Sequence, residues 1–278
     1  MQKTVPVQVI AVVSGKGGSG KTQTSINLAY ALAARGRRVL LWDGNFSMPG
    51  VAVALNLEPA YSIADVLAHQ CSLQEALCDT PFGFQVLPGA PLGHARALNR
   101  AHIYGLIQAF NTLDPVPDVV LIDCAPGMGD DVLFLAQAAT ERLIVIEDDP
   151  ANVFCALQVL YGLQERYGVG RFRLVVNRVQ AQDEGLNLHE QLLLKEGFPE
   201  GVVLDFSGEI YLDDMVQRSV QRQLVFCEAF PRSRVALAFR KIAEQIDAWP
   251  LPAHPRGAVE LFTERLVRVQ LLGQRTAK

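Results

Sequence analysis

The sequence lacks any arrangement of cysteine or histidine that is typical of a metal centre or a disulfide framework. Its five cysteines (Cys71, Cys78, Cys124, Cys155 and Cys227) are odd in number, and no two have C-x-x-C spacing. The five histidines show no ligand spacing either. This pattern argues against a zinc site or a disulfide scaffold, and it favours reduced thiols in a cytoplasmic protein.

Long apolar runs and an excess of positive charge are also missing. No apolar stretch approaches the roughly 18–20 residues that cross a bilayer. The N-terminus, MQKTVPVQVIAVVSG, is apolar only briefly, so we expect a first strand there and no signal peptide. The net charge of −4 provides no general surface for polyanions.

Short β-branched runs alternate with helical patterns along most of the chain. Strands are expected at 5–13, 37–43, 84–88, 118–123, 142–148, 171–177 and 201–206, and helices at 24–36, 102–111, 131–139, 151–166, 186–195 and 234–247. Continuous apolar strands in such an alternation predict an α/β fold with a mostly parallel sheet covered on both faces. We expect one domain over 1–248, a proline-rich linker at 249–257 and a short helix and tail at 258–278.

A phosphate-binding loop lies between the first strand and the first helix. The stretch SGKGGSGKTQTS (14–25) contains G-x-x-x-x-G-K-[ST] from Gly15 to Thr22, in the strand–loop–helix context that this motif requires. Backbone N–H groups of such a loop surround phosphate oxygens, Lys21 reaches the β- and γ-phosphates, and the Thr22 hydroxyl suits Mg²⁺. The candidate nucleotide-binding residues here are Gly15, Lys16, Gly17, Gly18, Ser19, Gly20, Lys21, Thr22 and Gln23.

A second segment that is expected to contact the phosphates begins at the end of the strand expected at 118–123. Asp123 begins D-C-A-P-G (123–127), and a carboxylate at a strand end facing the loop can hold the metal through water. Gly127 leaves room for a γ-phosphate and lets the segment move when that phosphate is lost. Together with the loop, these residues predict a P-loop nucleoside triphosphatase fold of three layers.

These motifs carry a family resemblance. The extra lysine of the loop (Lys16), the aspartate ending the second strand (Asp43) and the D-x-x-x-G segment resemble the MinD/ParA group of ATPases. The string EAFPRSRVALAFRKIAEQIDAWPLPAHPRGAVELFTERLV (228–267) resembles the FleN/FlhG branch, which regulates flagellar number. The resemblance implies ATP and Mg²⁺, with Thr22, Asp43 and Asp123 at the metal, and a homodimer in which Lys16 contacts the phosphates of the partner subunit.

The resemblance also assigns a base site. Asn177, in VVNR, matches the family asparagine that reads the adenine edge. Asp213, in YLDDMV (211–216), falls where the family has an aspartate near the base, although Tyr211 stands where the family has proline.

One departure from the family concerns catalysis. The segment after the second strand is D-G-N-F-S-M-P-G (43–50), and Asn45 replaces the aspartate that polarises the attacking water. An amide is a far poorer base than a carboxylate, so hydrolysis should be slowed while binding is kept. The residues expected to act in catalysis are Lys16, Lys21 and Asn45.

The C-terminal segment, AVELFTERLVRVQLL (258–272), has an apolar stripe of Val259, Phe262, Leu266 and Val269. The resemblance implies that this helix lies on the inner membrane surface, and docking on its own domain is the open alternative. The expected partners are a FleQ-type AAA+ transcription regulator and, less supported because only about four residues precede the first strand, an FlhF-type GTPase. The protein would then be cytoplasmic and in part peripheral to the membrane.

Four functions compete. The leading one is an ATP-dependent switch of the MinD/FleN type, and the second is a partitioning ATPase that coats DNA, which the acidic balance disfavours. A metabolic relative, such as an iron-protein reductase, would need paired cluster cysteines, and Cys124 has no evident partner. The fourth is a nucleotide-dependent scaffold with little turnover, for which Asn45 is the argument. Direct nucleic-acid binding is not expected.

Overall fold

The computed structural model describes residues 6–90 and 100–251, and the eight strands within these ranges form one sheet. The strands are β1 (Gln8–Val13), β2 (Val39–Gly44), β3 (Cys78–Asp79), β4 (Gln85–Leu87), β5 (Val119–Cys124), β6 (Glu141–Ile146), β7 (Arg171–Val179) and β8 (Val203–Tyr211). Their order is β3-β4-β2-β5-β1-β6-β7-β8, and neighbours run parallel except β3 with β4. The mostly parallel α/β sheet expected from the sequence is confirmed.

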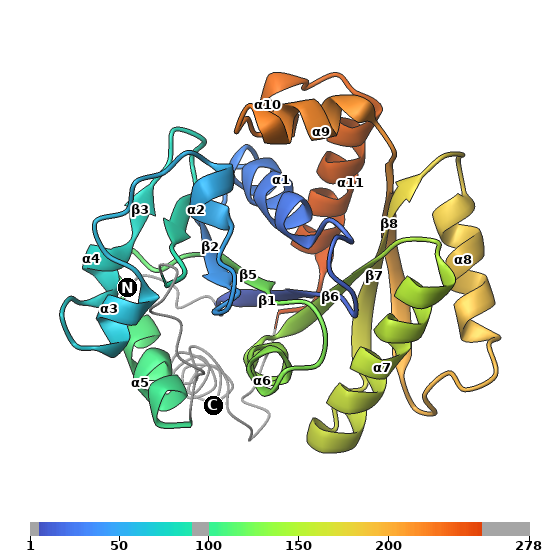
Figure 1. Cartoon of the computed structure of the whole chain (residues 1–278), viewed down its shortest axis with the longest axis horizontal. Coiled ribbons are helices and arrows are strands. Elements are labelled where there is room, and N and C mark those ends of the chain that lie inside the picture. The colour runs from blue at the N-terminus through green and yellow to red at the C-terminus, as the bar shows by residue number, and fades with distance from the viewer. Residues whose placement is uncertain (1–5, 91–99, 252–278) are drawn as a thin grey trace, which may run out of the picture.

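Helices cover both faces of this sheet (Figure 1). They are α1 (Lys21–Ala33), α2 (Val51–Ala54), α3 (Ile63–Leu67), α4 (Leu73–Ala76), α5 (Arg100–Asn111), α6 (Asp130–Ala138), α7 (Pro150–Tyr167), α8 (Glu184–Leu193), α9 (Asp214–Gln221), α10 (Phe226–Ala229) and α11 (Arg234–Ala248). One apolar cluster joins the sheet to α5, α6, α7 and α8, and a second joins it to α1, α10 and α11. The three layers therefore bury continuous apolar strands from both sides.

The position of β1 determines where a ligand site can form. β1 lies between β5 and β6. The strands from β2 to β5 lie on one side of β1, and the later strands β6, β7 and β8 lie on the other side. Such a switch in winding opens a crevice at the carboxyl ends of the strands. The same register sets Asp43 at the end of β2 beside Asp123 on β5. The phosphate loop, Asp43 and Asp123 thus meet at one edge of the sheet.

The structure differs from the sequence expectation mainly near the C-terminal end of the sheet. β8 was expected to end at residue 206, but it continues to Tyr211 across a register shift at Ser207. Gly208 has φ 139° there, and a side chain at this position would meet Ile242 of α11. A bulge and a glycine interrupt the alternation of apolar residues, so the sequence pattern does not predict the second half of the strand.

The end of α11 anchors the last described residues. α11 ends at Ala248, and Trp249 is buried with its ring 4.8 Å from the guanidinium of Arg173. None of the helices in the described ranges is both long and apolar enough to cross a bilayer. The apolar stripe expected at Val259, Phe262, Leu266 and Val269 lies outside the described residues.

Candidate functional site

The phosphate loop joins β1 to α1 and depends on glycine at specific points. Gly18 and Gly20 adopt φ of 85° and 89°, values that other residues rarely take. A side chain on Gly15 would lie 2.1 Å from the backbone of Cys155 in α7. By contrast, a side chain on Gly17 would meet only Pro126, at 3.9 Å. The loop is therefore held close to α7 at its start and turned by glycine at its end.

Lys21 is the buried cation of the loop. Its ammonium donates a hydrogen bond of 2.8 Å to Ser14 Oγ, and the side chain is largely buried. Burial lowers the pKa of Lys21, while the nearby Asp123 carboxylate acts in the opposite direction. A desolvated, preorganised cation at this place interacts strongly with an anionic ligand.

Two hydroxyl groups on one face of α1 contact Asp123. Thr22 Oγ1 donates to Asp123 Oδ2 at 2.7 Å, and Ser25 Oγ donates to Oδ1 at 3.2 Å. Burial raises the pKa of Asp123 to about 6, against these two hydrogen bonds and the charge of Lys21. A hydroxyl and a carboxylate side by side beneath a phosphate loop form the oxygen-rich set of ligands that Mg²⁺ prefers.

Asp43 is fully buried and organises the segment that follows β2. Its carboxylate accepts hydrogen bonds from three backbone N–H groups, those of Asn45 (3.2 Å), Gly50 (2.8 Å) and Val51 (2.9 Å). Burial and the charge of Asp123 raise the pKa of Asp43 to about 7 despite these bonds. Both oxygens hold the backbone in this structure, so the expected role of Asp43 at the metal stays a prediction.

Lys16 is exposed to solvent, whereas Lys21 is buried. Lys16 lies on the exposed part of the loop, and its side chain is 49% exposed. Its ammonium lies 3.6 Å from Asp149 Oδ2, in an ion pair whose acid is also 40% exposed. Asp149 is the N-cap of α7 and accepts from the backbone N–H groups of Ala151 and Asn152. An exposed pair of this kind contributes little to stability, so Lys16 can leave it at small cost.

Asn45 stabilises the turn that follows it through hydrogen bonds to its side chain. Its side-chain oxygen accepts hydrogen bonds from Ser47 Oγ and from the backbone N–H of Met48, both at 3.1 Å. These acceptor contacts are ones that a carboxylate could make equally well. The side chain lies at the same edge of the sheet as Asp43, two residues away, and its expected place beside the attacking water stays a prediction.

A cavity of about 500 Å³ opens next to the loop, between α1, the ends of β7 and β8, and α9. Among the residues that line it are Gly20, Gln23, Asn27, Asn177, Tyr211 and Asp213. Asn177 donates through Nδ2 to the Ser19 carbonyl at 2.9 Å, which ties β7 to the loop. Asp213 is the N-cap of α9 and accepts from the backbone N–H of Met215 at 2.8 Å. The structure thus brings together Asn177, Asp213 and the loop around one space.

Comparison with known proteins identifies the family of this chain. Residues 10–226 match the model of the CobQ/CobB/MinD/ParA nucleotide binding domain. The chain belongs to this family. It is 42% identical to the antiactivator FleN of Pseudomonas aeruginosa over 95% of its own length and 94% of that of FleN.

Solved structures of the CobQ/CobB/MinD/ParA family share the fold. MinD of Pyrococcus horikoshii, solved in complex with Mg-ADP, aligns over 87% of this chain and 96% of its own, with a TM-score of 0.69 and 25% identity. The MinC:MinD complex of Aquifex aeolicus contains a chain that aligns with a TM-score of 0.73 at 21% identity, covering 90% of this chain and 99% of that chain.

The sequence interpretation did not identify three residues of this candidate site. Ser14 binds Lys21, Ser25 binds Asp123, and Asp149 pairs with Lys16. Ser25 could have been found from its spacing, because it lies three residues after Thr22 on one helix face. Asp149 could also have been found, because an aspartate before proline is a typical start of a helix. For Ser14 the sequence offers no comparable signal.

Proposed function

We propose that this protein is an ATP-dependent, dimerising switch of the FleN type, which acts through contacts with other proteins and with the membrane. ATP and Mg²⁺ are its ligands in this proposal. FleN is an antiactivator by name, so the partner that we propose is a transcription activator, of the FleQ type of AAA+ regulators, and the process is control of flagellar number. An FlhF-type GTPase is a secondary candidate partner.

The contrast between the two loop lysines supports this proposal most directly. Lys21 points into its own subunit and is bonded to Ser14, whereas Lys16 is exposed and pairs with Asp149 on the surface. A lysine that is not needed within its own loop is free to reach the phosphates of a second subunit. The attraction between such a cation and a triphosphate grows when the interface excludes water, so dimerisation would depend on the nucleotide.

The residues present fit a magnesium nucleotide. Gly18 faces open space, because among the described residues other than its chain neighbours no atom lies within 4 Å of a side chain built on it, so the loop can surround phosphate. Thr22 and Asp123 would hold the ion, which supplies positive charge against the phosphate oxygens. Lys21 contributes a fixed charge beside them, and Asn177, Gln23 and Asp213 surround the space for a base.

Size-exclusion chromatography with a non-hydrolysable ATP analogue tests the proposal. Lys21→Ala should abolish nucleotide binding, because it removes the buried cation of the loop. Lys16→Ala should keep nucleotide binding and lose the dimer, because its charge acts across the interface. Lys195→Ala, which removes an exposed lysine after α8, is the matched control and should dimerise as the wild type does. A Lys16→Ala dimer as stable as that of the wild type would refute the proposed switch.

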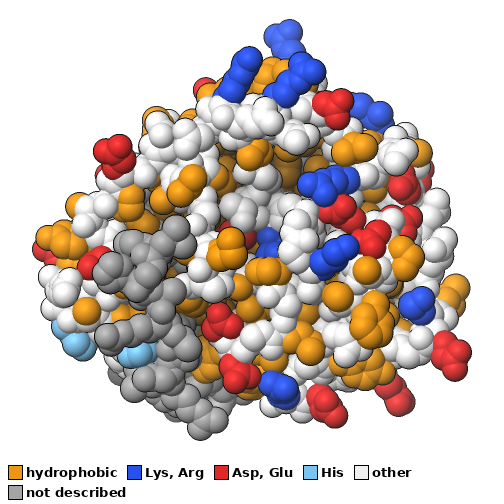
Figure 2. Space-filling view, in the orientation of Figure 1, with side chains coloured by type: hydrophobic (Ala, Val, Ile, Leu, Met, Phe, Trp, Pro, Cys, Tyr) orange, Lys and Arg blue, Asp and Glu red, His pale blue; other side chains and the backbone are white. Residues whose placement is uncertain are grey.

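A second candidate function is a nucleotide-dependent scaffold with little turnover. Asn45 favours it, because this amide replaces the expected carboxylate and its oxygen is engaged by Ser47 and Met48. The DNA-coating alternative has less support. Figure 2 shows charges of both signs interspersed over the face in view, with Lys and Arg gathered mainly along its upper margin over α9 and α10. The net charge of −4 also disfavours the broad basic area that a DNA-coating surface would need.

A further inference from the structure

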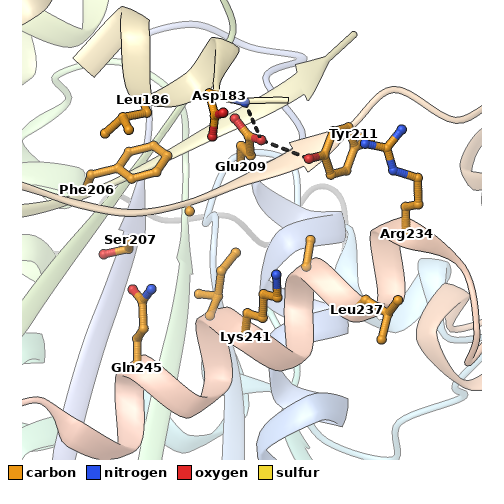
Figure 3. Close-up of a pocket in the computed structure, with 13 residues that line it drawn as sticks. Asp183, Leu186, Phe206, Ser207, Glu209, Tyr211, Arg234, Leu237, Lys241 and Gln245 are labelled. Carbon is orange, nitrogen blue, oxygen red and sulfur yellow. Dashed lines mark hydrogen bonds between the residues drawn. The ribbon is translucent and has the colours of Figure 1, made fainter. Parts of the chain in front are cut away.

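A groove lies at the outer edge of the sheet (Figure 3). This cavity of about 290 Å³, here named the β8 groove, is bounded by α11 on one side, the start of α8 on the other and β8 beneath. β8 is the last strand in the sheet order, so its outer edge pairs with no other strand in the described ranges. His189 of α8 contacts the Leu204 carbonyl at 2.7 Å, which covers only one end of this edge.

Apolar side chains are exposed along both walls of the β8 groove. Leu237 of α11 is 46% exposed and Leu186 of α8 is 38% exposed. Phe206 lies beside Leu186 in Figure 3 and is only partly buried. Leu186 and Phe206 lie at one end of the cavity and Leu237 lies at the other, so the groove offers apolar contacts to another molecule at both ends.

The charge in the groove is concentrated on α11. Arg234, Leu237 and Lys241 follow one another at helical spacing along the wall of the groove. Within the described part of the chain, no carboxylate lies within 4.0 Å of the Lys241 ammonium. The Arg234 guanidinium lies over the ring of Tyr211, 3.9 Å from its centroid.

The acidic groups of the groove, Glu209 and Asp183, lie away from the Lys241 ammonium and keep their own negative charge. Glu209 already accepts hydrogen bonds from the backbone N–H groups of Asp183 and Gly185 and from the Tyr211 hydroxyl. Asp183 lies on the wall opposite α11. The α11 wall therefore offers positive charge to an incoming carboxylate, next to the apolar side chains.

We propose that the β8 groove binds an extended peptide segment of a partner protein that carries an apolar side chain next to a carboxylate. One apolar side chain of the peptide packs against Leu186 and Phe206, a second packs against Leu237, and a carboxylate between them pairs with Lys241. The open edge of β8 supplies backbone donors and acceptors for the peptide, as in other cases of strand addition. The β8 groove shares Tyr211 with the cavity next to the phosphate loop but is lined by none of the loop residues, and the proposal does not depend on the function proposed above.

The tail of this chain is a poorer match for the β8 groove. Residues 256–278 carry five basic and two acidic side chains, and their charge is of the same sign as that of Lys241 and Arg234. A partner segment with acidic side chains complements the α11 wall better. Occupation by the tail is therefore a distinct outcome of the experiment.

Fluorescence anisotropy with a defined probe tests the proposal. The probe is a blocked, fluorescein-labelled hexapeptide of alternating leucine and glutamate, and it is titrated with the full-length protein. We expect saturable binding that weakens by about tenfold or more in Lys241→Glu and in Leu237→Asp, since each removes one part of the recognition. Both positions are exposed, so neither change should disturb the fold.

Matched controls separate specific binding from general attraction. Arg240→Glu makes the same change of charge one residue away, on an exposed side chain outside the groove, and should change the affinity less than about twofold. Peptides of leucine with lysine, or of serine with glutamate, should not bind. No saturable binding of the probe, or equal loss in Arg240→Glu and Lys241→Glu, would overturn the proposal. So would a gain of about tenfold or more on deletion of 256–278, which would identify the tail as the occupant.

Discussion

Asn45 is the residue at which the sequence predicts a departure from the chemistry of the family. Hydrolysis needs an oriented water and help in removing its proton, and general-base help is typically worth ~10²–10⁴-fold. An amide can orient water but accepts a proton poorly. The exposed Asp148 and Asp130 are the carboxylates that could replace it, and Asp130 is paired with Arg166 at 3.2 Å.

We expect ATP turnover by Asn45→Asp to exceed that of the wild type by at least about tenfold. The new carboxylate can keep the contacts with Ser47 and Met48, so the turn should not change. Release of phosphate, followed with and without anionic lipid, measures this effect. Ser47→Ala, which removes one contact of the same turn without adding a base, is the control. Equal rates in wild type and Asn45→Asp would mean that the substitution is silent.

The buried carboxylates Asp43 and Asp123 predict an unusual dependence of stability on pH. Their pKa values in the folded protein are raised to about 7 and about 6, above the ordinary value of an aspartate. The native state therefore binds more protons than the unfolded state between about pH 4 and pH 7. For each group, the stability present at low pH is lost as the pH rises through this window, by at most about 1.4 kcal/mol per pH unit.

Without nucleotide and magnesium, the free energy of unfolding should fall between pH 5 and pH 7.5, as measured by urea titration. Asp43→Asn should make this fall less steep, because one of the two titrating groups is gone. Asp118→Asn is the control, since pairing with Arg38 lowers the pKa of that carboxyl, and its contribution changes only at more acidic pH. A slope that Asp43→Asn leaves unchanged would show that Asp43 does not titrate in this range.

At the scale of elements, the contact between the phosphate loop and α7 can be tested by a pair of glycines. Gly15→Ala should destabilise the protein by about 1–3 kcal/mol or more and weaken nucleotide binding, because the added carbon would overlap the backbone of Cys155. Gly17→Ala should cost less than about 1 kcal/mol, because its nearest neighbour is 3.9 Å away. Chemical denaturation and nucleotide titration of both variants give the comparison. Equal effects would mean that the loop moves freely relative to α7.

The sequence predicted most elements of the sheet, and the reasons for its failures are physical. β1, β5 and β6 are mostly apolar and are buried on both faces. A continuous apolar run in the sequence is enough to predict such a strand. The short helices α2, α3, α4 and α10 have only four or five residues each, too few to show a period. α9 was missed because its residues are mostly polar, and only Ser219 of the helix is buried.

The candidate site was predictable to the extent that it is local in sequence. The loop residues from Gly15 to Thr22 follow from one motif, and Asp123 follows from a strand end. The pairing of Lys16 with Asp149 and of Lys21 with Ser14 depends on how the loop lies against its neighbours, which no spacing encodes. The cavity of about 500 Å³ next to the loop depends on the extension of β8 to Tyr211, which the sequence did not predict.

At the scale of the whole molecule, attachment to the membrane is the property to test. Deletion of 256–278 should release the protein from anionic liposomes in the presence of ATP and leave nucleotide binding intact. Phe262→Glu should have nearly the same effect, because a charge in the apolar stripe offsets what a short helix gains on insertion. Sedimentation with liposomes measures both variants.

Thr263→Glu is the matched control, because it adds the same charge beside the stripe and should keep most of the binding. Wild-type protein that fails to sediment with liposomes in ATP would instead favour docking of the helix on its own domain.

The burial of Trp249 against Arg173 determines where mechanical force would enter the protein. Arg173 of β7 pairs with Glu141 of β6 at 3.2 Å and with Asp205 of β8 at 2.8 Å. Tension on the C-terminal segment would therefore pass through Trp249 into three adjacent strands together, near their amino ends. The phosphate loop lies at the carboxyl ends, about 20 Å away along a strand of six residues. A pull transmitted through Trp249 would therefore be resisted at the edge of the sheet opposite the phosphate loop.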